Sequence, residues 1–270
     1  MSGLYPIVST CYKSVNKNLI SAFVERWYPE TNTFHLPFGE MTITVDDVAS
    51  LLHIPIEGKP IQSMTYDKEQ AVSLVHKYLG ISKQVARMEM DDRVGYKLSL
   101  SALHGVFEDV SDEWTDRAIR RAARAYLLFL LGNTLFADKS KTHVHICLLE
   151  PLKHLDSVST YSWGSAALAF LYRQLGLATR MGVKQIAGFL CLLESWIFEH
   201  FPCFHPSTNL YYENLPRAAR WNPSIDCAAS LVELRIFLDN IQEDQVNYFI
   251  SQITNNYSLH VVVIIFYIFE

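Results

Sequence analysis

The side chains best suited to bind an anion are four arginines, Arg117, Arg120, Arg121 and Arg124, which we call the arginine row. Steps of three and four residues bring them to one helix face, with Arg120 and Arg124 expected to point outward. Because a guanidinium group donates paired hydrogen bonds to phosphate or carboxylate oxygens, this face is a candidate site for nucleic acid or an acidic partner segment. The alternative, favoured by the acidic total charge, is pairing within the chain with Glu108, Asp109, Asp112, Glu113 or Asp116.

Alternating side chains in a short segment are the best candidates for metal ligands. His143, His145 and Cys147 would point to one side of a strand. Cys203 and His205 would add two more ligands. Zinc ligands usually occur in the sequence as two tightly spaced pairs, one on each side of the site. These five residues do not form such pairs. Ordinary packing explains it better, so we assign no metal and no cofactor to the sequence.

Other patterns are typical of catalytic sites but are incomplete. Asp46-Asp47 and Asp91-Asp92 lack a third carboxylate at an informative spacing for a two-metal nuclease, and the first pair fits helix capping. Ser162-Trp163-Gly164-Ser165 lacks the second glycine of a nucleophile elbow, and Ser162 fits a helix N-cap. Lys184 lacks the surrounding phosphate site of a pyridoxal-phosphate lysine. The sequence therefore predicts no enzyme.

The best specified element is a hairpin that leads into a helix. Thr33–Leu36 and Glu40–Thr44 are rich in β-branched and aromatic residues and flank a short Pro-Phe-Gly loop. Thr44 is expected to cap the following helix at its N-terminus. Pro55 and Gly58 are expected to end that helix, since neither residue continues a helix comfortably.

Apolar residues at helical spacing predict further helices along the chain. The expected helices cover residues 19–27, 68–79, 100–107, 115–136, 162–178, 183–200 and 228–238. Gly80 is expected to end one of them as a left-handed C-cap. We expect the last three helices and the apolar half of 115–136 to form one core, against which the hairpin packs. The predicted fold class is mainly α, a multi-helix globular domain with a small β-hairpin near the N-terminus.

Composition limits the class of protein further. The 270 residues are 50% hydrophobic, which is enough to bury a large core. A formal net charge of −5 gives no overall attraction to nucleic acid or to an anionic membrane. The five cysteines are odd in number and widely spaced, which predicts reduced thiols in an intracellular compartment. The longest apolar run, Val261–Phe269, is shorter than the ~20 residues of a membrane-spanning helix, so no membrane contact is expected.

Several stretches of the sequence resemble the plant mobile domain family. The first, Val24–Ile61, is VERWYPETNTFHLPFGEMTITVDDVASLLHIPIEGKPI, and the others are Leu127–His145, Tyr161–Arg180 and Lys184–Pro202. The family includes the MAIN-like proteins, so the resemblance implies a nuclear protein that acts through partners in meristem maintenance and transposon silencing. Some members are fused to a phosphatase whose motifs this chain lacks, which implies a phosphatase-like protein as a partner rather than phosphatase activity.

The resemblance also divides the chain. It implies an N-terminal extension of residues 1–16, a domain of residues 17–246 and a divergent apolar tail of residues 247–270. Family members continue after the domain's last helix with a Trp-x-Pro-Tyr stretch, where this chain has Asn247-Tyr248-Phe249. The sequence therefore predicts a member shortened at its C-terminus, with apolar helix faces left uncovered and poor solubility for the chain alone.

Two classes of function stay open. The first is a non-catalytic nuclear protein-interaction module. The second is a nucleic-acid-binding or processing domain of transposon descent. Binding of duplex DNA separates them, because phosphate contacts make affinity fall steeply with salt. For either class, the arginine row is the candidate contact surface.

Overall fold

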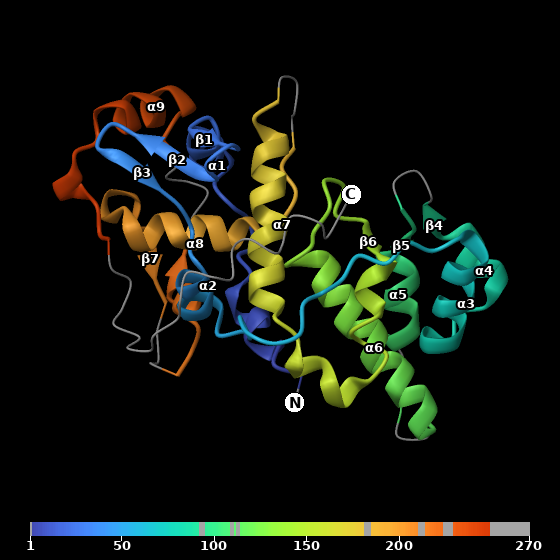
Figure 1. Ribbon diagram of the computed structural model, residues 1–270. Coiled ribbons are helices and arrows are strands. Elements are labelled where there is room, and N and C mark those ends of the chain that lie inside the picture. The colour runs from blue at the N-terminus through green and yellow to red at the C-terminus, as the bar shows by residue number, and fades with distance from the viewer. Residues whose placement is uncertain are drawn as a thin grey trace. The chain divides into compact units, whose positions relative to one another are not determined.

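The computed structural model describes residues 2–91, 95–108, 111, 114–180, 185–209, 214–223 and 229–248 (Figure 1). Apart from the chain ends, they form two compact units. Unit 1 is the continuous stretch Gly58–Tyr161, and unit 2 joins Gly3–Glu57 to the residues from Ser162 onward. Both units are mainly helical with small antiparallel sheets, which confirms the predicted fold class. No helix in the described ranges is both long and apolar enough to cross a membrane.

Unit 2 is built around the helix α8. Its α-helices are α1 (Lys17–Val24), α2 (Val45–Leu52), α7 (Trp163–Ala178), α8 (Leu190–His200) and α9 (Leu231–Asn240). Its 3-10 helices are η1 (Tyr5–Thr10), η4 (Pro202–Phe204), η5 (Arg217–Arg220) and η7 (Glu243–Gln245). Every residue of α8 from Leu192 to His200 is buried, so this helix lies in the centre of the unit's core.

A three-stranded antiparallel sheet packs on that core. Its strands are β1 (Trp27–Tyr28), β2 (Thr33–Leu36) and β3 (Gly39–Met41), and a separate ribbon pairs β7 (Ser207–Thr208) with β8 (Trp221–Asn222). The Phe34 ring stacks on Trp196 of α8 at 5.3 Å between ring centroids and meets Phe23 of α1 edge-on at 5.8 Å. The predicted hairpin is confirmed. Trp27, which the sequence predicts to lie on the first helix, lies in β1 instead.

The N-terminus of α2 is capped as the sequence predicts. The Thr44 hydroxyl accepts a hydrogen bond from the Asp47 amide at 3.1 Å, and the Asp47 carboxylate accepts one from the Thr44 amide at 2.7 Å. The helix ends earlier than predicted, at Leu52 rather than near Pro55. The reason is that His53 takes a left-handed conformation, with φ 51°, which closes the helix.

The helix α8 begins later than predicted. The sequence predicts one helix over 183–200, whereas residues 185–189 are not helical and α8 starts at Leu190. Gly188 has φ 96°, which no right-handed helix accommodates, so the helix starts only after it. The last predicted helix, 228–238, is observed as α9 over Leu231–Asn240.

Residues 3–16 pack within unit 2. Leu4 and Ile7 are fully buried. The Asn16 side chain caps α1, and its backbone amide donates a hydrogen bond to Glu194 of α8 at 2.7 Å. The segment that the sequence treats as an extension thus contributes to the core of the unit.

Unit 1 contains the helices α3 (Lys68–Leu79), α4 (Lys83–Met88), α5 (Leu100–Phe107) and α6 (Asp116–Asn133), with the 3-10 helices η2 (Ile146–Leu149) and η3 (Leu155–Thr160). Its sheet consists of β4 (Met90–Asp91), β5 (Lys97–Ser99) and β6 (His143–His145). Gly80 ends α3 with φ 80°, as predicted, and Thr115 caps α6. Because α6 belongs to unit 1 and α7, α8 and α9 belong to unit 2, these helices do not share the single core that the sequence predicts.

The two ends of unit 1 are paired with each other. The Lys59 amide donates a hydrogen bond to the Thr160 carbonyl at 2.8 Å, and Lys59 forms a β-bridge with Tyr161. A Cβ atom at Gly58, where φ is 129°, would lie 2.3 Å from the Thr160 oxygen, so only glycine permits this approach. The chain therefore enters and leaves unit 1 at the same place.

Candidate functional site

The arginine row lies on the first half of α6, in unit 1. Arg117 and Arg120 are exposed, whereas Arg121 and Arg124 are half-buried. Arg120 pairs with Asp116 one helical turn away, at 3.0 Å, with 50% and 83% of the two side chains exposed. A pair this exposed contributes little to stability, so the Arg120 guanidinium group remains accessible to an anion in exchange for Asp116.

Arg124 is bound to backbone carbonyl groups. Its Nε and Nη2 donate hydrogen bonds to the carbonyl oxygens of Leu152 and Lys153, each at 3.1 Å. Its Nη1 donates one to the carbonyl oxygen of Arg120, also at 3.1 Å. The structure therefore differs from the expectation that Arg120 and Arg124 point outward together. The spacing of arginines defines a helix face, but it does not show which other segment packs on that face.

Arg121 lies against the C-terminal end of α3. A Cβ atom at Gly80 would lie 2.9 Å from Cδ of Arg121 and 3.0 Å from its Nη1. Unpaired carbonyl groups give such a helix end a partial negative charge, which favours a cation there. Among the described residues, the buried Nε of Arg121 has no hydrogen-bond partner. Arg121 therefore helps to hold α6 against α3.

Cations gather around one aromatic ring beside the arginine row. Nζ of Lys77 lies 5.0 Å from the centroid of the Tyr78 ring, and Nζ of Lys153 lies 5.5 Å from it. Cζ of Arg124 lies 5.7 Å from the same centroid. We call Lys77, Tyr78, Arg124 and Lys153 the Tyr78 cluster, and we include Arg120 because its carbonyl oxygen accepts a hydrogen bond from Arg124. Lys77, Tyr78 and Lys153 carry no sequence signal that links them to the arginine row, because they lie far from it along the chain.

The positive charges of the Tyr78 cluster act on one another. Burial lowers the pKa of Arg124 from its usual range, and the charges of Arg120 and Arg121 lower it further. Carboxylates lie at the edge of the cluster, where Glu150 pairs with Lys153 at 2.6 Å. The cluster is therefore a local concentration of positive charge on a chain whose net charge is negative.

The candidate metal ligands do not form a metal centre in the described residues. His143 and His145 lie in β6, and Cys147 follows in η2. Burial lowers the pKa of His145 to about 4 and raises that of the Cys147 thiol to about 12. The His145 Nδ1 already accepts a hydrogen bond from the Cys147 amide at 3.3 Å. No group of three or more histidine, cysteine or acidic side chains in the described ranges could hold a metal ion.

The other candidate catalytic residues have structural roles or lie outside the described residues. Asp47 forms the capping box of α2. Ser165 is buried and donates a hydrogen bond to the Ile56 carbonyl at 2.5 Å, which leaves no exposed nucleophile there. Ser162 occupies the N-cap position of α7, but its side chain makes no capping hydrogen bond. Lys184 and Asp92 lie outside the described residues.

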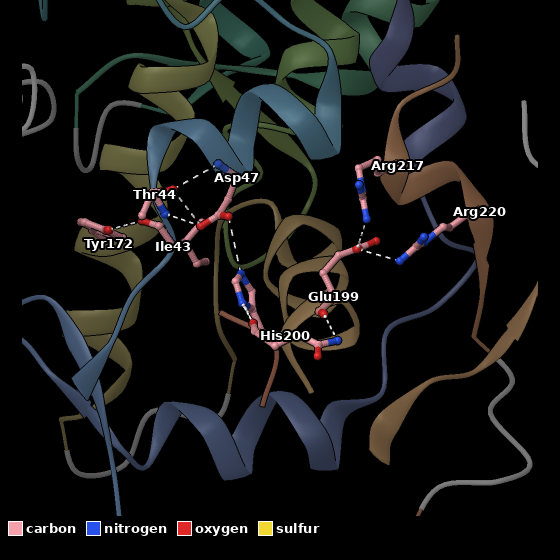
Figure 2. Close-up of polar contacts among 9 residues, drawn as sticks. Ile43, Thr44, Asp47, Tyr172, Glu199, His200, Arg217 and Arg220 are labelled. Atoms are coloured by element: carbon pink, nitrogen blue, oxygen red, sulfur yellow. Dashed lines mark hydrogen bonds and ion pairs between the residues drawn. The ribbon is translucent and has the colours of Figure 1, made fainter. Parts of the chain in front are cut away.

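A buried polar network in unit 2 was missed by sequence reasoning. Glu199, with 2% of its side chain exposed, accepts hydrogen bonds from Arg217 at 2.9 Å, Arg220 at 2.7 Å and Nε1 of Trp221 at 3.0 Å. Figure 2 shows both guanidinium groups directed at this one carboxylate. The carboxylate is thus satisfied by its own chain, and its role is to fix η5 and β8 to the end of α8.

The neighbouring residue His200 extends this network to other segments. Its Nε2 lies 3.5 Å from Oδ1 of Asp47 (Figure 2). Its Nδ1 lies 2.5 Å from the Asn247 carbonyl oxygen. The Asn247 amide in turn donates a hydrogen bond to the His200 carbonyl at 2.8 Å. Asn247, which the sequence analysis places in the divergent tail, therefore binds α8. Residues 249–270 of that tail lie outside the described residues.

A shallow pocket of about 460 Å³ lies on unit 2. It is lined by Glu25, Arg26, Tyr28, His35, Pro37, Arg235 and Asp239. The Tyr28 and His35 rings stack on one wall at 3.6 Å between centroids. Ion pairs of Arg26 with Asp239 and of Arg235 with Glu25 join α9 to the end of α1. Both guanidinium groups are already matched by carboxylates, so the pocket offers no unbalanced charge to a ligand.

Most of the chain matches a known family. The model of the plant mobile domain matches residues 3–256, and the chain belongs to the plant mobile domain family. It is 38% identical over 210 residues to Protein MAIN-LIKE 2 of Arabidopsis thaliana, an alignment that covers 77% of this chain and 30% of that protein. It is 32% identical over 237 residues to Protein MAINTENANCE OF MERISTEMS of the same plant, covering 87% of this chain and 48% of that protein.

A third relative bears the name of an enzyme. The chain is 36% identical over 204 residues to the Serine/threonine-protein phosphatase 7 long form homolog of Arabidopsis thaliana, which covers 76% of this chain and 15% of that protein. The chain spans less than half the length of each of these relatives. No solved structure matches the chain significantly.

Proposed function

We propose that this chain is a non-catalytic protein-interaction module that acts in the nucleus, in meristem maintenance and in the silencing of transposons and genes. The observation that carries the proposal is similarity over most of the chain to Protein MAINTENANCE OF MERISTEMS and to Protein MAIN-LIKE 2. A phosphatase-like protein is the proposed partner, because the same domain occurs in a relative named as a phosphatase homolog.

The arrangement of polar groups supports an interaction role. The buried carboxylate of Glu199 is occupied by Arg217, Arg220 and Trp221, and that of Asp47 by the capping box. Because groups of the same chain occupy these carboxylates, the carboxylates are not free to receive a substrate. The Tyr78 cluster, by contrast, presents cations at the surface of unit 1, where a partner can reach them.

Affinity capture from plant nuclei tests the proposal. The tagged full chain is compared with Arg120→Glu and with Lys139→Glu, a charge reversal at an exposed position in a turn of the same unit. We expect the full chain to enrich nuclear proteins, Arg120→Glu to lose them and Lys139→Glu to retain them. A fluorescent fusion should accumulate in nuclei. A chain that enriches no protein above a tag-only control, or a fusion excluded from nuclei, would contradict the proposal.

The second candidate function is binding of nucleic acid, which the arginine row favours. The net charge of −5 argues against it, because it gives no overall attraction to a nucleic acid. Titration of duplex DNA at increasing salt separates the two functions. Each phosphate contact steepens the fall of affinity with salt, so a steep dependence that Arg120→Glu reduces would establish this function instead. We expect weak binding that Arg120→Glu and Lys139→Glu affect equally.

A further inference from the structure

The cations of the Tyr78 cluster come from separate segments of unit 1. Lys77 lies in the last turn of α3, Arg124 in α6, and Lys153 in the turn between η2 and η3. All three approach the Tyr78 ring within 5.7 Å of its centroid. Like charges repel at this range, and the face of the ring offsets only part of that repulsion. The fold thus holds together cations that an anion would stabilise.

Not every cation of the cluster is available to a ligand. Arg124 uses Nε, Nη1 and Nη2 on carbonyl oxygens, and by binding those of Leu152 and Lys153 it holds their turn against α6. Lys153 forms an ion pair with Glu150. Lys77 is exposed, and within the described part of the chain no carboxylate lies at ion-pair distance from it. Lys77 is therefore the cation that can contact an anion directly, and Arg120 can do so only in exchange for Asp116.

We propose that the Tyr78 cluster binds a phosphorylated segment of a protein partner, with Lys77 contacting the phosphoryl group. This inference rests on the proposed function and names the chemistry of the partner. A phosphoryl group fits because it carries up to two negative charges and three acceptor oxygens, which can contact cations from several segments at once. A carboxylate carries only one negative charge, so it offsets less of the repulsion among these cations.

A protein segment fits this surface better than a nucleic acid does. A duplex presents a continuous line of phosphates and needs cations along an extended track. Here the cations are confined to the end of α3, the first half of α6 and one turn. Asp116 and Glu150 lie at the edges of the cluster, where they would repel further phosphates. One phosphoryl group on an otherwise neutral segment meets the cations without meeting these carboxylates.

Fluorescence anisotropy with the full chain tests the inference. The probe is a labelled short glycine–serine peptide with one phosphoserine, compared with its unphosphorylated form and with a short duplex DNA. We expect the phosphopeptide alone to bind, inorganic phosphate to compete, and Lys77→Glu to weaken binding about tenfold or more. The matched charge reversal Lys139→Glu should retain the affinity of the unaltered chain. Binding should also weaken below about pH 6, where the phosphoryl group loses its second charge.

Several results would overturn the inference. Equal binding of both peptides, no binding of either, or equal losses in Lys77→Glu and Lys139→Glu would show that the cluster does not recognise a phosphoryl group. Tighter binding of duplex DNA that Lys77→Glu abolishes would make the cluster a nucleic-acid surface. Melting temperatures of both variants must match that of the unaltered chain, because an unfolded variant would lose binding trivially.

The test distinguishes this inference from the proposed function. If nuclear proteins are captured equally by the unaltered chain and by Lys77→Glu, and the phosphopeptide does not bind, the inference fails and the proposed function stands. If the phosphopeptide binds but the chain captures no nuclear protein, the proposed function fails instead.

Discussion

Glu194 shows how the position of one residue sets its charge state. Its side chain is fully buried on α8 and accepts the Asn16 amide through Oε1, while Oε2 has no hydrogen-bond partner among the described residues. Burial raises the pKa of this carboxyl group from its usual 4.5 to about 7, against the opposing effect of the Asn16 hydrogen bond. Near neutral pH, a substantial fraction of the chains therefore holds a proton at this buried position.

The raised pKa of Glu194 predicts a pH-dependent stability. Between pH 4.5 and pH 7 the folded chain binds this proton more tightly than the unfolded chain does. The contribution of Glu194 to the free energy of unfolding is therefore complete below pH 4.5 and is lost as pH rises through 7. As pH rises from 4.5 to 7, the free energy of unfolding of the unaltered chain should fall by up to about 3 kcal/mol because of Glu194. The Glu194→Gln variant should not show this fall. Urea denaturation over a pH series measures it, with Glu30→Gln at an exposed position as the control. Parallel curves for Glu194→Gln and the unaltered chain would contradict the prediction.

Trp163 tests the core of unit 2 at the level of one side chain. It is fully buried at the start of α7. We expect Trp163→Ala to lower the free energy of unfolding by about 3–5 kcal/mol, because the cavity cannot fully close. Thermal denaturation measures this effect. A melting temperature equal to that of Lys139→Ala would show that Trp163 does not fill the core.

Asp138 is not the neutral control that its position in a polar turn suggests. Its carboxylate accepts hydrogen bonds from the Ser140 hydroxyl at 2.9 and 3.0 Å and from the Thr142 amide at 3.4 Å. Asp138→Ala should therefore lower the free energy of unfolding by about 1 kcal/mol. Lys139, exposed in the same turn, is the better control.

At the scale of elements, helices with local end signals were predictable. The helix α3 matches its predicted range, 68–79, because Gly80 as its C-cap is adjacent in sequence. For α2 the capping residues were predicted and the end was not, since His53 has no sequence signal for a left-handed conformation. Helix starts and stops can be read where a local hydrogen bond or a glycine sets them.

Features that depend on distant segments were not predictable from local patterns. β5 pairs with β6 through Lys97 opposite His145, and strands of three residues have too little alternation to be recognised. The same limit applied to the candidate site. The arginine row was visible as a spacing, but the carbonyl groups that hold Arg124 lie at residues 152 and 153. Lys77 and Lys153 join that site only through tertiary packing.

The paired ends of unit 1 can be tested with two glycines of similar conformation. Gly58 and Gly39 have φ 129° and 144°, but an added Cβ meets the Thr160 oxygen at 2.3 Å only at Gly58, and nothing within 4 Å at Gly39. We expect Gly58→Ala to lower the free energy of unfolding by about 1–3 kcal/mol more than Gly39→Ala does. Both variants strain the backbone at a positive φ, but only Gly58→Ala adds a clash with the Thr160 carbonyl group. Thermal denaturation of both variants measures the difference. Equal losses would mean that the Lys59–Thr160 pairing adjusts without cost.

At the scale of the whole molecule, the two units differ in how the chain builds them. Unit 1 is one continuous stretch whose ends pair with each other, so residues 58–161 hold the contacts of the unit within themselves. We expect this fragment, expressed alone, to show helical circular dichroism and a cooperative thermal transition. A broad transition without cooperativity would show that it requires the rest of the chain.

Unit 2, by contrast, is interrupted by all of unit 1, and this affects how the protein is made. Ion pairs such as Arg26–Asp239 join residues on either side of the interruption. A ribosome needs about 5–20 s to synthesise the stretch between the two halves. During that time Phe23 and Phe34 have emerged without Trp196 to cover them, whereas unit 1 can already fold. Apolar side chains of the nascent N-terminal half are therefore exposed to solvent and to chaperones until α8 has been synthesised.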